Sequence, residues 1–177
     1  MKKIKNMKYN FFVLQLLFVL FFVSCEKNSP EPNIIEFEKQ QVVSFYDWKI
    51  ISPNGNSQNF ITKTNKVNFV YYWSTSDKEN LDNLDRLEKF YNKYNTKLEF
   101  VFITKDNQVD VRNFIKANGY TFPVFFSLSP IPSPMKMDEY SRAYLISKKG
   151  RIVVDNLGLA NWNSNLFYEI VDGLIKQ

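Results

Sequence analysis

Runs of apolar residues alternate with helical patterns through most of the chain. Two runs, 67–73 and 98–103, are rich in β-branched and aromatic residues, as expected for strands that are buried on both faces. Between them, from 77 to 94, apolar residues recur at helical spacing and predict a helix with one apolar face. A strand–helix–strand unit of this length predicts a parallel strand pair joined by a right-handed crossover.

Weaker patterns precede this unit. Residues 42–51 alternate loosely and predict a first strand, and the Pro-Asn-Gly-Asn sequence of 53–56 predicts a turn because Asn and Gly tolerate positive φ. Residues 60–61 predict a short partner strand. The sequence therefore predicts a β-hairpin ahead of the main strand.

The second half of the chain continues the alternation of strands and helices. After strand 98–103, Asp106 or Asn107 is expected to cap a helix that ends at Asn118-Gly119, and a short apolar strand follows at 122–126. The Ser/Pro-rich stretch 127–134 predicts irregular structure, because proline lacks an N–H and restricts the residue before it. The last predicted elements are a hairpin of strands 142–147 and 151–155 and a C-terminal amphipathic helix over 166–175.

The first 24 residues follow a different pattern. Four lysines before residue 9 precede an apolar run over 11–23 that is interrupted only by Gln15. This pattern is typical of a secretory signal and is too short for an ordinary spanning helix. Ser24 before Cys25 resembles the lipobox of bacterial lipoproteins, in which the cysteine is acylated and becomes the mature N-terminus. We expect a signal peptide at 1–24, a lipidated N-terminus and tether at 25–40, and one domain at 41–177; the alternative is an uncleaved signal that stays as an anchor.

Removing this segment changes the charge of the protein. The chain has 23 Lys+Arg and 18 Asp+Glu, and four of the lysines but none of the acids precede Cys25, which leaves a net charge of +1 from residue 25 onward. The basic excess therefore predicts no nucleic-acid partner. The chain has no histidine and one cysteine, so the usual ligands of zinc and copper are missing, and we expect no metal and no other cofactor.

The junction between strand 67–73 and helix 77–94 carries the most specific pattern. It reads W-S-T-S-D-K-E-N from Trp73 to Asn80, and Ser76 with Glu79 fits a capping box. This stretch resembles the active-site segment of TlpA-type thiol-disulfide reductases of the redoxin/AhpC-TSA-like group, which read W-A-T-W-C-P-P-C. Trp73 and the threonine match, and the two cysteine positions fall on Asp77 and Asn80.

A second stretch extends the resemblance. Residues 141–152 read S-R-A-Y-L-I-S-K-K-G-R-I, where the family reads approximately P-T-T-F-L-I-D-x-x-G-x-I. The cis-proline of the family falls on Ser141, where we expect a trans peptide because a cis bond before a non-proline residue costs about 2.5–4 kcal/mol. A register with the cis-proline at Pro123 stays open. The resemblance covers 42–176 and implies an α/β, thioredoxin-like fold: a central mixed β-sheet flanked by helices, with an N-terminal β-hairpin extension.

The chain departs from the family at the positions that carry its chemistry. Dithiol exchange needs an attacking and a resolving thiolate, and Asp77-Lys78-Glu79-Asn80 stands in place of the CxxC, which argues against an enzyme. A helix N-terminus that stabilises a thiolate also stabilises a carboxylate, so we expect an ionised Asp77. Asp77 is then either an ordinary acidic residue of a first helical turn or the mark of a contact site for a partner.

Three functions remain open from the sequence. The first is a non-enzymatic binding or assembly role in the cell envelope, held at a bacterial membrane by lipid, with an envelope protein or peptide as partner. Its candidate surface consists of Trp73, Ser76, Asp77, Ser141 and Arg142. The alternatives are an oxidoreductase-related protein that uses a cysteine of a partner and a purely structural lipoprotein. The partner, the inner or outer membrane and the oligomeric state stay open.

Overall fold

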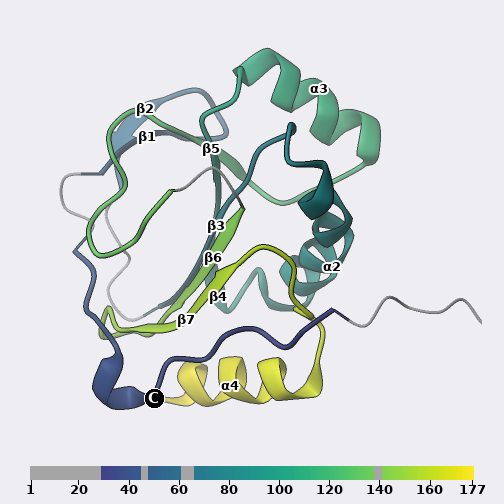
Figure 1. Ribbon diagram of the computed structural model, residues 1–177. Coiled ribbons are helices and arrows are strands. Elements are labelled where there is room, and N and C mark those ends of the chain that lie inside the picture. Colours follow the sequence, from purple (N-terminus) through teal and green to yellow (C-terminus); the bar gives the residue numbers. More distant parts are fainter. Residues whose placement is uncertain (1–28, 45–47, 61–65, 138–140) are drawn as a thin grey trace, which may run out of the picture.

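The computed structural model describes residues 29–177, except 45–47, 61–65 and 138–140 and the side chains of Glu79 and Asn80. Its strands form one seven-stranded sheet in the order β2-β1-β5-β4-β3-β6-β7 (Figure 1). Strands β3, β4 and β5 are parallel to one another, whereas the other neighbours pair antiparallel. The elements are η1 Phe37–Lys39, β1 Lys49–Ile51, β2 Ser57–Asn59, β3 Val67–Tyr72, α2 Lys78–Tyr94, β4 Leu98–Thr104, α3 Gln108–Asn118, β5 Val124–Ser127, β6 Arg142–Ile146, β7 Ile152–Leu157 and α4 Asn165–Lys176. The predicted mixed sheet with an N-terminal hairpin is confirmed.

Strand β3 is the centre of the predicted unit and pairs on both sides. It runs parallel to β4, from the Val67–Leu98 pair to the Tyr72–Ile103 pair, and antiparallel to β6. All of its side chains except that of Tyr72 are buried, which explains its continuous apolar and aromatic sequence. The parallel pairing of β3 and β4 across α2 is therefore as predicted.

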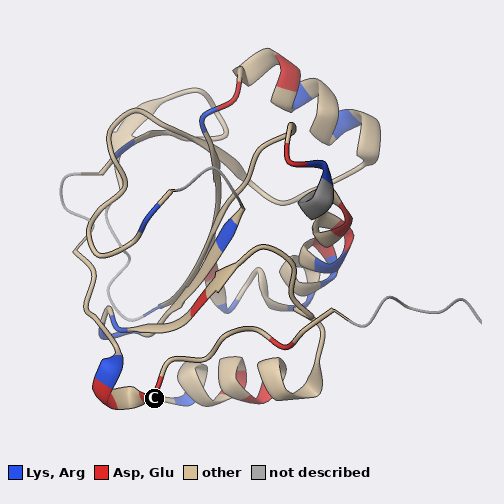
Figure 2. Ribbon diagram, viewed as in Figure 1, with Lys and Arg blue, Asp and Glu red and all other residues tan. Residues whose placement is uncertain are grey.

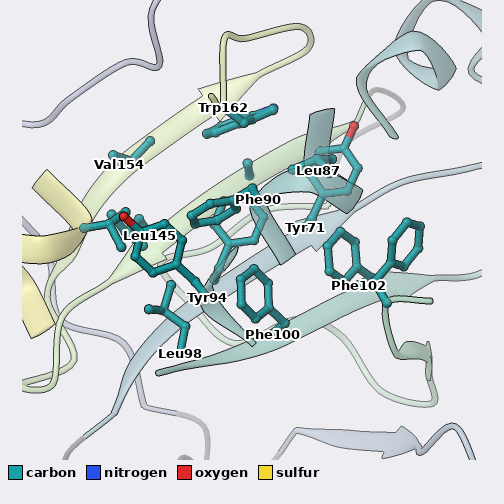
Figure 3. Close-up of a cluster of buried hydrophobic side chains, with 14 of the residues drawn as sticks. Tyr71, Leu87, Phe90, Tyr94, Leu98, Phe100, Phe102, Leu145, Val154 and Trp162 are labelled. Atoms are coloured by element: carbon teal, nitrogen blue, oxygen red, sulfur yellow. The ribbon is translucent and has the colours of Figure 1, made fainter. Parts of the chain in front are cut away.

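Within the described residues, the helices α2, α3 and α4 pack against one face of the sheet. Aromatic side chains fill this core: Figure 3 shows Phe90 of α2, Phe100 of β4 and Trp162 close together. Phe69 of β3 lies at the middle, with ring centroids 5.1 Å from Phe90 and 5.4 Å from Trp162 in edge-to-face geometry. Such pairs contribute about 0.5–1.5 kcal/mol each beyond the burial of their area. Most of the aromatic richness of the chain is thus ordinary core packing.

The opposite face of the sheet is covered by loops in the described part of the chain. Trp48 and Phe60 lie on this side with rings 5.4 Å apart, and Met135 of the Ser/Pro-rich connection packs into the same cluster. The irregular structure predicted for 127–134 is confirmed from Leu128 onward, whereas Ser127 is the last residue of β5. This connection has a structural role as the cover of the second core.

Residues 29–43, which we call the strap, run along the outer edge of β7. Ile35 N donates to Val153 O at 2.8 Å, Ile152 N to Gln41 O at 2.9 Å, and Asn161 N to Pro30 O at 2.8 Å. The sequence predicts a tether over 25–40, but residues 30–40 belong to the folded domain. The reason is that β7 is an edge strand, and its outward N–H and C=O groups are satisfied by this segment.

Two other elements differ from the predicted ranges. Of the predicted strand 42–51, Lys49–Ile51 forms β1, and residues 45–47 lie outside the described residues. Val42, which belongs to the strap, forms an isolated bridge with Arg151. The hairpin partner of β1 is Ser57–Asn59, polar and exposed, instead of 60–61. The pattern failed here because the apolar Phe60 packs against Trp48 just beyond the strand end, and Ile61 lies outside the described residues.

Candidate functional site

The candidate site lies where β3 ends, α2 begins and β6 begins. Trp73 N still donates to Ile103 O at 3.1 Å, so the strand pairing extends one residue beyond β3. The Ser74-Thr75-Ser76 turn then leads into α2, whose N-cap residue is Asp77. β6 is antiparallel to β3, and its first residue, Arg142, pairs with Tyr72 at the end of β3. This pairing places Ser141 opposite the start of α2.

Asp77 and Ser141 are joined by two hydrogen bonds. Oδ2 of Asp77 accepts from the backbone N of Ser141 at 3.0 Å and from its Oγ at 2.9 Å. Ser141 is 2% exposed and Asp77 is half-buried. Hydrogen bonds to an ionised acceptor are stronger than those between neutral groups. Asp77 therefore contacts the residue directly before β6 instead of acting only as an acidic residue of a first helical turn.

The N-cap of α2 differs from the one that the predicted capping box requires. Asp77, and not Ser76, is the N-cap residue of α2, and its side chain accepts no capping hydrogen bond. The Ser76 hydroxyl instead lies 2.8 Å from Oγ of Ser74. Oδ2 of Asp77 is instead directed to Ser141. The side chain of Glu79, the other half of the predicted box, lies outside the described residues.

Asp106 holds the turn before α2 in place. Its Oδ2 accepts from Thr75 N at 2.7 Å and from Thr75 Oγ1 at 2.8 Å, and the Ser74 hydroxyl lies 3.0 Å from both of its oxygens. The sequence predicts Asp106 or Asn107 as the cap of the next helix, and Asn107 takes that role by accepting from Val109 N and Asp110 N. Asp106 was therefore missed as a site residue, since nothing in its local sequence connects it with a turn about 30 residues earlier.

The five residues of the candidate partner surface differ in accessibility. Ser76 is exposed, and Asp77 and Arg142 are half-buried. Trp73 is 1% exposed and packs against Phe114 and Phe122, so it is a core residue and not part of the surface. Ser141 is also buried.

Arg142 is held beside the site by an acid of β7. Its Nε lies 2.7 Å from Oδ1 of Asp155 and its Nη2 lies 2.8 Å from Oδ2, a bidentate pair. Its guanidinium also stands over the Tyr144 ring at 5.5 Å from the centroid. This geometry fixes a planar cation next to Ser141 in sequence, on the face of β6 that also carries Tyr144 and not on the face of the Asp77–Ser141 contact.

Polar side chains are buried directly beneath Asp77 and Ser141. Burial raises the pKa of the Tyr71 phenol far above its ordinary value, and the negative charge of Asp77 adds to this effect, while the nearby Ser141 and Asn83 side chains oppose it. Neither side chain completes a hydrogen bond with the phenol, and Oδ1 of Asn83 also has no hydrogen-bond partner. The phenol therefore stays protonated in the folded protein.

The structure shows where Ser141 and Pro123, the two candidates for the cis-proline position, lie. Ser141 contacts Asp77, whereas Pro123 lies before β5 in a groove lined by α3 side chains. The cis peptide bond among the described residues is Ser133–Pro134, so the bond before Pro123 is trans. The bond before Ser141 involves Tyr140, which lies outside the described residues, as do Cys25 and the side chain of Asn80.

Comparisons with known proteins concern the fold of the chain. No protein-family model matches the chain, and no curated protein matches it in sequence. Among solved structures, a DsbF homologue from Corynebacterium diphtheriae superposes with a TM-score of 0.61 at 15% identity, covering 86% of this chain and 98% of that one. The chain has the thioredoxin-like fold.

Two other solved structures with this fold are described as a thiol-disulfide isomerase and as a thioredoxin. A secreted thiol-disulfide isomerase from Corynebacterium glutamicum has a TM-score of 0.61 at 14% identity, covering 88% of this chain and 97% of that one. The pneumococcal exposed lipoprotein thioredoxin from Streptococcus pneumoniae has a TM-score of 0.53 at 13% identity, with 71% and 98% covered. At these identities the likeness concerns the fold.

The chemistry available at the site follows from its side chains. The chain contains one cysteine, and the cysteine positions of the resembled family fall on Asp77 and Asn80. The described residues hold no cluster of three or more His, Cys, Asp or Glu side chains that could ligate a metal ion. None of the helices in the same described part of the chain has the length and apolar character that crossing a bilayer requires. Carboxylate, hydroxyl and guanidinium groups remain, which are suited to hydrogen bonding.

Proposed function

We propose that this protein is an exported, lipid-anchored thioredoxin-like protein of the bacterial envelope that binds a polypeptide partner without redox chemistry. Cys25 carries the lipid, and the site around Ser76, Asp77 and Arg142 carries the binding. The partner is an envelope protein or peptide. Export is supported by the signal-like N-terminus and by two of the neighbours in fold, of which one is described as secreted and the other as an exposed lipoprotein.

The observation that carries the proposal is the pair of hydrogen bonds between Asp77 and Ser141. A dithiol reductase needs a thiolate at the first cysteine position of its CxxC motif and a resolving thiol at the second cysteine position. Here the first position holds a carboxylate that is already bound to the strand beside it, and a carboxylate cannot form a mixed disulfide. The interaction stabilises a closed, non-reacting site, while Ser76 and half-buried Asp77 and Arg142 leave polar groups within reach of a partner.

The redox part of the proposal is tested by an insulin-reduction assay on residues 25–177, beside a Cys25→Ser variant and an Asp77→Cys/Asn80→Cys variant. The unaltered protein is expected to reduce insulin no faster than the Cys25→Ser variant. The double-cysteine variant is expected to gain activity, since its thiol at 77 lies at a helix N-terminus that lowers a thiol pKa. Activity of the unaltered protein at the rate of the double-cysteine variant would overturn the proposal.

The binding and anchoring parts need cells that produce the full chain. A photo-crosslinking residue at Ser76 is expected to give a discrete adduct that weakens with Asp77→Ala, whereas the same residue at exposed Lys116 of α3 is expected to give none. The N-terminal peptide is expected to begin at Cys25 and to carry acyl mass on this residue, whereas a peptide that begins at Met1 would indicate the uncleaved signal as the anchor. Equal crosslinking at Ser76 and Lys116 would contradict a binding role of this site.

A further inference from the structure

The exposed apolar side chains of the described residues gather along one edge of the domain. Seven large apolar side chains are exposed: Ile34, Phe37, Val42, Val109, Leu128, Leu157 and Leu166. The first three belong to the strap, Leu157 ends β7, and Leu166 is in the first turn of α4, beside the contact between Ser164 and Glu31 of the strap. Five of the seven thus lie on the strap or on the elements that it touches. Exposed apolar side chains that gather in one place mark contact surfaces.

The strap presents its apolar side chains on a bulge that is fixed to the domain. The strap forms bridges with Val154 of β7 at Ile34 and with Arg151, the residue before β7, at Val42, and η1 lies between these bridges. Phe37 of η1 is 64% exposed and Val42 is 59% exposed. The Arg151 guanidinium stands 4.9 Å from the centroid of the Phe37 ring. Phe37 is therefore held outward at a defined place.

The other end of the strap lies close to the proposed lipid. Ser29 Oγ accepts a hydrogen bond of 2.7 Å from Arg86 Nη1, so the chain is fixed to the domain from this residue onward. Cys25 is four residues earlier, a reach of at most about 14 Å. A bilayer that holds acyl chains on Cys25 is therefore beside the strap, and Figure 1 shows α3 and the β1–β2 hairpin on the side of the domain away from the strap and α4.

The charges at this edge do not favour a charged binding partner. Acidic and basic residues are mixed at η1 (Figure 2), where Lys39 pairs with Glu36 at 2.6 Å and Glu38 adds a further acid. A polyanion is therefore poorly matched, whereas the interface of a bilayer accepts an apolar side chain with flanking charges. The exposed apolar side chains and the closeness to the lipidated residue both favour a bilayer at this edge.

We infer that the strap edge, led by Phe37 and Val42, inserts into the bilayer surface and fixes the orientation of the domain on the membrane. This inference rests on the proposed anchoring at Cys25. The lipid alone would leave the domain free to turn about its N-terminus, and Phe37 supplies a second point of contact. The domain then lies with the β7 edge against the bilayer and α3 directed away from it.

Site-specific quenching by brominated lipids tests this orientation. Residues 25–177 are coupled through Cys25, the one thiol of the chain, to a maleimide lipid in vesicles, which supplies the anchor even if cells do not acylate this residue. Phe37→Trp is compared with Val109→Trp at the N-terminal end of α3, a matched control because Val109 is 65% exposed. The native Trp48, Trp73 and Trp162 are at most 1% exposed, so they are shielded from the bromine atoms and contribute the same unquenched background to both chains.

The expected result is loss of emission from the Phe37→Trp chain on brominated vesicles and no loss from the Val109→Trp chain. Equal quenching of both chains, or of neither, would overturn the inference. In a second measurement without coupling, Phe37→Ser is expected to lower the partition of the Cys25→Ser chain into vesicles about tenfold, the value for removing one buried large apolar side chain. Unchanged partition would also overturn it. Absence of acyl mass on Cys25 in cells would contradict the proposed anchoring but not these two results.

Discussion

Oδ2 of Asp77 accepts two hydrogen bonds from Ser141, from the backbone N at 3.0 Å and from Oγ at 2.9 Å. The resemblance to TlpA-type reductases places a cysteine at the first of these positions and a cis-proline at the second. Proline has neither donor, since it lacks an N–H and a hydroxyl. The two replacements therefore fit each other: the carboxylate needs donors, and serine provides both.

Asp77→Ala is expected to destabilise the protein by about 1–3 kcal/mol, because it leaves the N–H of the buried Ser141 without an acceptor. The measurement is urea unfolding at pH 7. Asp82→Ala, which removes an exposed acid from the same helix, should change stability by less than about 0.5 kcal/mol. Equal effects of the two substitutions would show that the bonds to Ser141 contribute nothing.

Asp77 and Ser141 are expected to be energetically coupled. In a double-mutant cycle of Asp77→Ala and Ser141→Ala, the coupling free energy should be about 1 kcal/mol or more, since the hydroxyl bond is to a charged group. The control pair is Asp77→Ala with Ser164→Ala. Ser164 caps α4 by accepting a hydrogen bond from Phe167 N, so Ser164→Ala destabilises the protein. This loss of stability should add to that of Asp77→Ala without a coupling free energy. If the effects of Asp77→Ala and Ser141→Ala on stability are additive, the two residues are not energetically coupled.

The fold could be predicted from the sequence because its signals are local. The apolar run of β3, the helical spacing of α2 and the Gly119 stop of α3 each depend on a few neighbouring residues, and the structure confirms all three. The strap could not be predicted in this way. Its polar and proline-containing sequence is typical of a tether, and its order comes from the free edge of β7.

The candidate site was predicted only in part for a similar reason. The positions of Asp77 and Ser141 came from the resemblance, but their hydrogen bonds join residues 64 apart in sequence. Trp73 was assigned to the surface because it opens the motif, whereas its ring lies in the core against Phe122. Local sequence shows where an element begins and does not show which distant side chain meets it.

Asp106 is expected to be needed for the conformation of the turn before α2. Asp106→Ala removes the acceptor for Thr75 N and for two hydroxyls, and we expect a loss of about 1.5–3 kcal/mol and faster amide hydrogen exchange at Thr75. Asp110→Ala, an exposed acid in the first turn of α3, should cost less than about 1 kcal/mol and leave the exchange of Thr75 unchanged. If Asp106→Ala does not accelerate exchange at Thr75, the turn is held by other contacts.

Tyr71 is expected to make stability fall with pH in the alkaline range. Burial raises its pKa in the folded protein above the ordinary value of 10.0, so folding favours the protonated phenol. This contribution is fully present below pH 10 and is lost as pH rises above it, by about 1.4 kcal/mol for each pH unit. Tyr71→Phe should therefore gain stability relative to the unaltered protein as pH rises above 10.

At pH 7 the same substitution should change stability by less than about 1 kcal/mol, since the phenol has no hydrogen-bond partner to lose. The measurement is guanidinium unfolding at several pH values from 7 to about 11, with Tyr91→Phe, a half-buried phenol of α2, as the control for removal of one tyrosine. If the stability difference between Tyr71→Phe and the unaltered protein does not change with pH, Tyr71 has the same pKa in the folded and unfolded chains. That result would contradict the expectation from its burial beneath Asp77 and Ser141.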